Sequence, residues 1–352
     1  MHTRRLVVDP NNLTTLETHN AITLAAEILR AGGTVAVPTE TVYGLGANAL
    51  DESAVAKIFA AKQRPAWDPV IVHVADEAMV ETLVIGISAT ARALMTAFWP
   101  GPLTLLMPRS AAVPGAVTAG RPLVGVRMPA HPVTLELIRR AGVPIAAPSA
   151  NLFGHTSPTT AAHVLADLDG RIDAVLDAGP TAHGVESTVL DPALHPMVIY
   201  RPGAVTAEQI RAVAGQVEIY EADESVTAQP REALPSPGVS LRHYAPNAKI
   251  VLVEGDVPDL GAKIAVALKT LAPHRTGVLL PGGIDIPGTP AGTIVFNWGR
   301  WSAPEEMARC LYAGLRELDA QNCFAIVCPL PRGEGIGGAI RDRLLKAAAS
   351  DR

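Results

Sequence analysis

Aromatic residues and cysteines are both scarce in this sequence, and each shortage excludes a class of protein. Phe, Trp and Tyr make up 4% of the 352 residues, which disfavours a surface on which RNA bases stack. The three cysteines, Cys310, Cys323 and Cys328, form no CxxC pair, so we expect neither a disulfide framework nor a zinc site. We expect them to be buried core thiols in a reducing cytoplasm.

Charge is also limited, and no apolar segment is long. Charged residues make up 18% and the net charge is −5, without the basic excess that is typical of nucleic-acid-binding domains. No run of about 18 or more apolar residues occurs, so no membrane-spanning helix is expected. The N-terminal "MHTRRLVVDPNN" lacks the apolar run of a signal peptide. A cytoplasmic globular protein is the simplest interpretation.

Segments typical of helices and strands alternate along most of the chain. "NAITLAAEILRAGG" predicts a helix with Asn20 as its N-cap, and "TVAV" after it predicts a strand. This alternation predicts an α/β fold with a twisted mixed sheet and flanking helices. A polar segment with three prolines follows, which is typical of a linker. Beyond it, strands separated by helices at 259–271 and 304–320 predict a smaller, Rossmann-like α/β domain.

Familiar nucleotide-binding and catalytic motifs are absent or incomplete. No GxxxxGK[ST], GxSxG or HExxH occurs. "GEGIGG" at 333–338 matches GxGxxG, but Arg352 is only 14 residues past Gly338, which leaves no room for the further strand and acidic residue of a dinucleotide site. We therefore prefer a tight strand-to-helix turn, with the dinucleotide site as the weaker alternative.

Polar side chains gather repeatedly where apolar strands end. Loops at strand ends form the ligand crevice of open α/β sheets, and cations with hydroxyl donors suit a polyphosphate. No nucleophile is paired with a base, which favours direct attack on phosphorus by a substrate group. The clusters are Thr39, Thr41 and Tyr43; Lys62, Arg64 and His73; Thr118, Arg121 and Arg127; Ser149, Asn151 and Ser157; Glu186, Ser187 and Thr188; and Arg201.

Each of these residues also has an ordinary structural explanation. Arg127 could form a surface ion pair, Ser149 and Asn151 could shape a turn, and His73 could be a core histidine. The prediction of a phosphate site therefore depends on their joint occurrence.

The segments that carry these clusters also occur in a recognisable order. They are "PTETVYGLGANA", "KQRP…DPVIVHV", "WPGPLT", "VRMPAHP", "PIAAPSANLFGHTSPT", "GVESTVLD" and "RPGAVT", followed by "SPGVSLRHYAP" and "GIGGAIRDRLLKAA". Together they resemble the YrdC-like family in its long, two-domain form, that of the threonylcarbamoyl-AMP synthases. The resemblance covers nearly the whole chain. It implies a YrdC-like catalytic domain at 10–215, a linker at 216–247 that covers the active site, and a C-terminal α/β domain at 248–352.

The activity that this resemblance implies uses L-threonine, bicarbonate and ATP, with Mg²⁺ on the phosphates. The threonine amine becomes a carbamate that attacks the α-phosphate, giving threonylcarbamoyl-AMP and pyrophosphate. A partner threonylcarbamoyl transferase then modifies tRNA next to the anticodon. By the same resemblance, Thr39, His73, Arg127 and Ser187 would hold threonine. Lys62 and Arg64, the expected catalytic pair, would hold ATP with Thr118, Ser149, Asn151, Ser157 and Arg201. His243 and Tyr244 would act as a lid.

Two positions depart from the family pattern. Asp68 and Asp342 stand where Asn is more usual, and a carboxylate at Asp68 would disfavour phosphate unless it points away or pairs with Arg64.

Two other functions compete with the synthase. A carbamoyl-transferring relative from hydrogenase maturation would need zinc-finger cysteines that the sequence lacks. A non-catalytic module for RNA binding or ribosome maturation is disfavoured by the net charge of −5 and the few aromatics.

Overall fold

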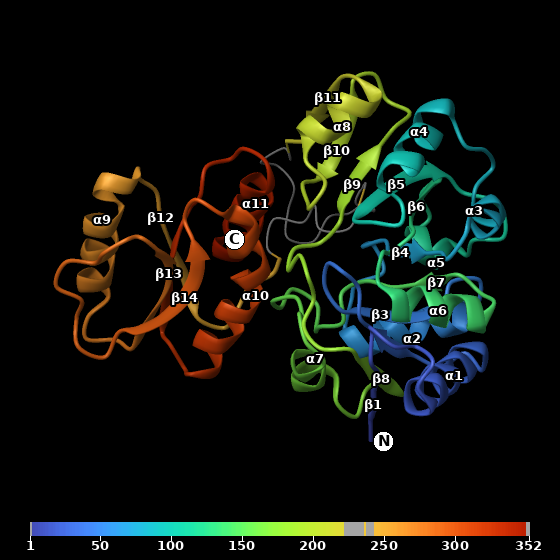
Figure 1. Cartoon of the computed structure of the whole chain (residues 1–352), viewed down its shortest axis with the longest axis horizontal. Helices are drawn as coiled ribbons and strands as arrows, with labels where there is room; N and C mark the ends of the chain where they lie inside the picture. Colours follow the sequence, from blue (N-terminus) through green and yellow to red (C-terminus); the bar gives the residue numbers. More distant parts are fainter. Residues whose placement is uncertain (1, 222–235, 237–242, 350–352) are drawn as a thin grey trace.

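The computed structural model describes residues 2–221, 236 and 243–349. These form two α/β domains that lie side by side (Figure 1). Most of the expected linker, 222–235 and 237–242, lies outside the described residues. Within them, no helix has the length and apolar character needed to cross a membrane.

A mixed sheet forms the first domain, and it extends beyond the expected limits of 10 and 215 at both ends. The first strand, at residues 4–7, pairs in parallel with residues 174–177. The last strand, at residues 217–219, pairs in parallel with residues 197–199. In spatial order the strands are β1 (Arg4–Val7), β8 (Ala174–Asp177), β2 (Val35–Val37), β3 (Gly44–Asn48), β7 (Ile145–Ala146), β4 (Ile71–His73), β6 (Leu123–Arg127), β5 (Leu103–Pro108), β9 (Thr188–Asp191), β10 (Met197–Arg201) and β11 (Val217–Ile219).

Helices cover the two faces of this sheet unequally. Side chains alternate along each strand, so Ala36 packs into one hydrophobic cluster while Val35 and Val37 pack into another. The Val35 cluster receives mainly α1 (Leu16–Arg30) and α6 (Pro132–Ala141). The larger cluster receives α2 (Glu52–Lys62), α3 (Glu77–Leu83), α4 (Ala89–Phe98), α5 (Gly115–Thr118), α7 (Ala161–Leu168) and α8 (Ala207–Ala214).

The first helix begins earlier than predicted. Thr15, not Asn20, is the N-cap of α1, because the Thr15 hydroxyl accepts a hydrogen bond from the Thr18 amide. Asn20 therefore lies inside the helix, and the prediction of an Asn20 cap was wrong.

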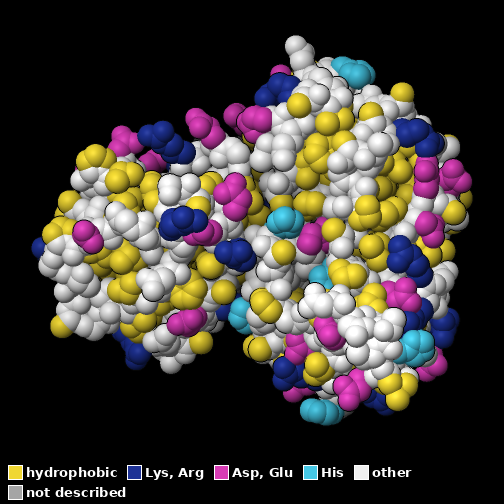
Figure 2. All heavy atoms as spheres, in the orientation of Figure 1, with side chains coloured by type: hydrophobic (Ala, Val, Ile, Leu, Met, Phe, Trp, Pro, Cys, Tyr) yellow, Lys and Arg dark blue, Asp and Glu magenta, His cyan; other side chains and the backbone are white. Residues whose placement is uncertain are grey.

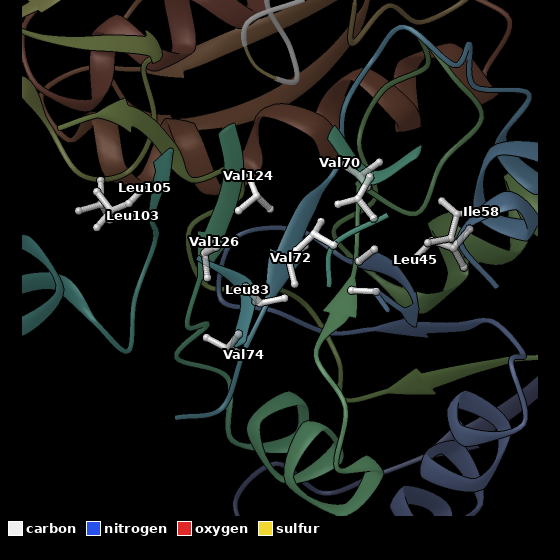
Figure 3. Packing of buried hydrophobic residues seen from close by; sticks show 14 of the residues in the cluster. Leu45, Ile58, Val70, Val72, Val74, Leu83, Leu103, Leu105, Val124 and Val126 are labelled. Atoms are coloured by element: carbon white, nitrogen blue, oxygen red, sulfur yellow. The ribbon is translucent and has the colours of Figure 1, made fainter. Parts of the chain in front are cut away.

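The core of the first domain lies under the larger group of helices. Leu45 of β3, Val72 of β4 and Val126 of β6 are fully buried there, with Ile58 of α2 and Leu83 of α3 packed against them (Figure 3). Because side chains alternate, Ile71 and His73 point to the other face of β4. His73, at the end of β4, therefore points away from this core.

The second domain is a parallel sheet between two helical layers. Its strands, in spatial order, are β12 (Lys249–Val253), β15 (Ala325–Pro329), β13 (Thr276–Gly282) and β14 (Ile294–Arg300). One face carries α9 (Val257–Leu271), and the other carries α10 (Pro304–Ala320) and α11 (Ile336–Ala348). The predicted helices at 259–271 and 304–320 are confirmed, as is the strand-to-helix turn at 333–338, which leads into α11.

Residues of the first domain complete the core of the second. Val42 and Val185 are buried in the same cluster as Leu311 of α10 and Ile340 of α11. Gly184 makes this approach possible: its φ is +72°, and a Cβ there would lie 2.5 Å from the Ala308 carbonyl oxygen. Helices α10 and α11 consequently lie between the second sheet and the first domain (Figure 1).

The cysteines lie in this second domain. Cys323 and Cys328 are buried free thiols, as predicted, whereas Cys310 on α10 is only half-buried.

Candidate active site

A small cavity lies at the carboxyl ends of the parallel strands β4, β6 and β10. His73 ends β4, Arg127 ends β6 and Arg201 ends β10, and His73 and Arg127 are register partners. The cavity has a volume of about 40 Å³, which is room for a few water molecules. The structure thus brings these three strand-end residues together at one cavity.

Most of the predicted site residues line this cavity, and four do not. Thr118 is at the end of α5, where its hydroxyl lies 3.5 Å from the Gly115 carbonyl oxygen. Lys62 and Ser157 are outside the wall but donate hydrogen bonds to Ser149 and Glu186, which line it, and the Asn151 carbonyl oxygen accepts a hydrogen bond from Lys62. The predicted residues in the wall are Thr39, Arg64, His73, Arg127, Ser149, Ser187, Arg201, His243 and Tyr244.

Lys62 supports the loop that carries Ser149. The Lys62 ammonium donates hydrogen bonds to the carbonyl oxygens of Ser149 and Asn151, at 2.6 and 2.5 Å. Burial, with the nearby Arg64 guanidinium, lowers the pKa of Lys62 well below its ordinary value. Lys62 therefore fixes the backbone of the loop and presents Ser149 to the cavity.

Asp68, a departure from the family pattern, pairs with Arg64. The Asp68 carboxylate lies 3.0 Å from the Arg64 guanidinium, and both side chains are buried. Arg64 also donates to the carbonyl oxygens of Asp68 and Pro69, at 3.1 and 2.6 Å. Burial raises the pKa of Asp68, while Arg64 opposes that rise. The pair holds Arg64 at the edge of the cavity.

Arg127 has a carboxylate partner that the sequence prediction missed. Its guanidinium lies 2.6 Å from Glu40 and donates to the Thr41 hydroxyl at 3.0 Å and to the Gly101 carbonyl oxygen at 3.2 Å. Only the position of Glu40 between Thr39 and Thr41 could have suggested this role. Because an Arg has five N–H donors, Arg127 retains donors for an anionic ligand.

Ser187 and Arg201 form a second polar wall. Arg201 donates to the Ser187 hydroxyl at 3.0 Å and to its carbonyl oxygen at 3.1 Å. The Thr104 hydroxyl lies 2.9 Å from that of Ser187. This arrangement fixes one cation and one hydroxyl in the wall of the cavity.

Glu186 belongs to one of the predicted strand-end clusters, but the sequence prediction assigned it no ligand or partner. It lines the cavity and accepts hydrogen bonds from Ser157 at 2.6 Å, Tyr312 at 2.9 Å and Arg343 at 2.7 Å. Burial opposes its ionisation, yet Arg343, Arg201 and the Ser157 hydroxyl hold its pKa at about 2. Because Tyr312 and Arg343 belong to the second domain, no local pattern could have identified these contacts.

Asp342, the other departure from the family pattern, lies beside this group on α11. Its carboxylate pairs with Arg343 and, at 2.7 Å, with Lys346. The negative charge is thereby matched within the helix.

His73 is neutral, because burial and the nearby Arg127 lower its pKa to about 3. Among the described side chains, nothing contacts His73 Nδ1, His243 Nδ1 or the Tyr244 hydroxyl by a hydrogen bond. All three residues line the cavity. Unpartnered polar atoms in a buried wall indicate contacts that a ligand or water completes.

His243 and Tyr244 close the cavity from the side of the second domain. The Tyr244 ring lies 4.9 Å from the Arg343 guanidinium, and the His243 ring lies 5.6 Å from Phe153 of the first domain. Tyr244 has a φ of +64°, a conformation that is strained for a bulky side chain. Contacts with both domains therefore hold this pair in place.

Three buried guanidiniums, those of Arg64, Arg127 and Arg201, thus converge on one cavity beside hydroxyl groups. Such a site binds and neutralises several anionic groups at once, as phosphoryl chemistry requires. The fold and the site define a two-domain α/β enzyme with an anion-binding site at the strand ends.

Known proteins narrow this class. A family model described as "Telomere recombination" matches residues 27–203. The model of the threonylcarbamoyl-AMP synthase C-terminal domain matches residues 205–349. The chain is 43% identical to the threonylcarbamoyl-AMP synthase of Bacillus subtilis over 99% of this chain and 98% of that protein. It is also 43% identical to the synthase of Pyrococcus abyssi, over 93% and 94% of the two chains.

A solved structure supports the same assignment. The crystal structure of P. abyssi Sua5 complexed with L-threonine superposes with a TM-score of 0.90 at 40% identity, over 98% of both chains. The chain belongs to the threonylcarbamoyl-AMP synthase family, in its long two-domain form. It is accordingly an enzyme of the nucleotidyltransferase type.

Proposed function

We propose that this protein condenses L-threonine, bicarbonate and ATP into threonylcarbamoyl-AMP and pyrophosphate. Threonine and bicarbonate first combine to a carbamate with loss of water. A carbamate oxygen then bonds to the α-phosphorus as the bond from that phosphorus to the pyrophosphate oxygen breaks. The observation that carries this proposal is the convergence of Arg64, Arg127 and Arg201 on one cavity, in a chain so similar to known synthases.

Threonine binds, in this proposal, on the side of Thr39, His73, Arg127 and Ser187. Arg127 binds the threonine carboxylate through the N–H groups that Glu40 and Thr41 leave available. His73 is supported in this role by its neutrality, since a neutral imidazole can accept a hydrogen bond that an imidazolium cannot. Ser187 offers its hydroxyl beside Arg201.

ATP binds against Arg64, Ser149 and Arg201, whose cations neutralise charge on the phosphates. Lys62 acts on the same substrate through the loop at 149–151, which it holds by two carbonyl oxygens. The nucleotide contacts expected of Thr118, Asn151 and Ser157 remain predictions, because in this conformation other residues form the wall.

His243 and Tyr244 act as a lid. Sites for ligands of this size have volumes of roughly 300–1,000 Å³, far above the cavity of about 40 Å³ here. Substrates therefore enter only after the pair has moved, and its return excludes water from a reactive acyl adenylate.

Mg²⁺ enters with ATP, and the nucleotide phosphates supply most of its ligands. Within the described residues, no group of three or more His, Cys, Asp or Glu side chains could hold a metal ion. The product is consumed by a partner transferase that modifies tRNA. Basic and acidic side chains are intermixed on the face shown in Figure 2, which favours an enzyme over a module that only binds RNA.

The test is pyrophosphate release by the purified full chain with ATP and Mg²⁺. Release that requires both L-threonine and bicarbonate is the expected result. Arg127→Ala should abolish it, whereas Arg92→Ala, which removes an exposed ion pair with Glu77, should not. Release indifferent to threonine would refute the proposal, and tight tRNA binding without turnover would favour the RNA-binding alternative.

A further inference from the structure

A cation of the second domain reaches the active site of the first. Arg343 of α11 is 1% exposed, and its Nε lies 2.7 Å from the Glu186 carboxylate. Its Nη2 donates to the Pro202 carbonyl oxygen at 3.0 Å, and its guanidinium lies 4.9 Å from the Tyr244 ring. Arg343 therefore contacts three separate segments of the site.

Each of these segments contributes to the cavity wall. Glu186 lines it and directly precedes Ser187, and Pro202 directly follows Arg201. Tyr244 belongs to the lid. One side chain thus fixes both ends of the wall that holds Ser187 and Arg201, and it also supports the closed lid.

The Glu186–Arg343 pair is costly to assemble, and its hydrogen bonds are nearly complete. Removing two charges from water is unfavourable unless their remaining donors and acceptors are satisfied. Here Ser157 and Tyr312 also donate to Glu186, and Asp342 pairs with Arg343. Such a network holds its members in one arrangement, although a hydrophobic contact would join two domains at lower cost.

We propose that Arg343 is a positioning residue of the synthase, through which the C-terminal domain holds Glu186, the backbone after Arg201 and the lid in their working arrangement. This inference depends on the proposed function. It assigns to the second domain a direct part in binding threonine. It also predicts that removal of Arg343 weakens threonine binding in the intact enzyme.

The decisive variants are Arg343→Met, Glu186→Gln and the two combined. Arg341→Met is the matched control, because Arg341 is on the same helix and pairs with the exposed Glu254 at 2.7 Å. Arg343→Met should lower kcat/KM for threonine about tenfold or more, mainly by raising KM, because Glu186 is left as an unpaired buried charge. Glu186→Gln in addition should restore part of this loss.

The pH profile separates positioning from a general structural role. Without Arg343, burial raises the pKa of Glu186, so protonation at falling pH removes the unpaired charge. The ratio of variant to wild-type kcat/KM should then rise as the pH falls from 8 to 6, and it should stay flat in the combined variant. Other charged or titratable groups lie near this pair, but they are present in both the variant and the wild type, so their titration cancels in the ratio. They are Arg201, His243, Tyr244, Tyr312, Asp342 and Lys346.

The outcomes are distinguishable. Wild-type chain without threonine-dependent pyrophosphate release would refute the proposed function. An active wild type with Arg343→Met equal to Arg341→Met, in KM and in pH profile, would refute the positioning role. If Arg343→Met does not fold, Arg343→Lys decides, since it keeps a cation at Glu186 but loses the hydrogen bond to the Pro202 carbonyl oxygen. A raised threonine KM at a wild-type Tm supports the proposal, and a wild-type KM overturns it.

Discussion

Replacing Gly184 by Ala should separate the two domains at the active site. The added Cβ would lie 2.5 Å from both the Ala308 carbonyl oxygen and the Arg309 Cα of α10. Carbon contacts are normally about 3.5 Å or longer, so α10 must retreat by about 1 Å. The Tyr312 hydroxyl, now 2.9 and 3.0 Å from the two oxygens of Glu186, would then lie beyond hydrogen-bonding distance.

The expected cost has two parts. Ala at a positive φ costs about 1–2 kcal/mol, and losing hydrogen bonds to an ionised group costs about 1.5–3 kcal/mol. Gly142→Ala is the control for the first part, because Gly142 has a φ of +67° and no atom within 4 Å of an added Cβ.

Urea unfolding and threonine-dependent pyrophosphate release should be measured on both variants. Gly142→Ala should lower the free energy of unfolding by only the about 1–2 kcal/mol of the positive φ, and it should keep its activity. Gly184→Ala should lose about 2.5–5 kcal/mol in total and most of its activity. Equal stability and equal activity of the two variants would refute the reasoning.

Two further predictions concern buried charge near the cavity. His73 is neutral in the fold with a pKa of about 3, whereas unfolded His takes up a proton near pH 6.5. Its contribution to stability is therefore complete above that pH and declines as the pH falls towards 3, by up to about 1.4 kcal/mol per pH unit. His73→Gln should flatten the dependence of the urea unfolding free energy between pH 6 and 4, and an unchanged slope would contradict this. Asp68→Asn removes a negative charge beside the phosphate site while Arg64 keeps its bonds to two carbonyl oxygens. It should lower the KM for ATP by up to about tenfold; a raised KM would show instead that the carboxylate positions Arg64.

The sequence predicted those strands and turns whose structure depends on neighbouring residues in the chain. The apolar strand before His73 and that before Arg127 were recognisable, and their polar ends meet because β4 and β6 are parallel neighbours. Likewise, the turn at 333–338 followed from glycines between a strand and a helix. The strand β3 (Gly44–Asn48) was not anticipated, because glycine disfavours strands; its pairing with β2 and β7 and the burial of Leu45 in the core stabilise it.

Contacts between distant segments were beyond the reach of such signals. Glu186 and Arg343 are 157 positions apart, and nothing in either segment indicates that the two residues pair. Glu40 gave no sign that its partner would be Arg127. The burial of the Glu186–Arg343 pair depends on how the two domains dock, and the packing of Val42, Val185 and Gly184 against the second domain cannot be read from their own segments.

The shared hydrophobic core limits how this chain can be divided. Because Val42 and Val185 pack among residues of α10 and α11, cutting the chain between the domains would expose apolar surface on both fragments. It would also leave the Glu186 carboxylate without Tyr312 and Arg343. The two fragments would therefore be poorly soluble apart and would tend to reassociate when mixed. The two sheets are separate in the sequence, but through their shared core they form one folding unit.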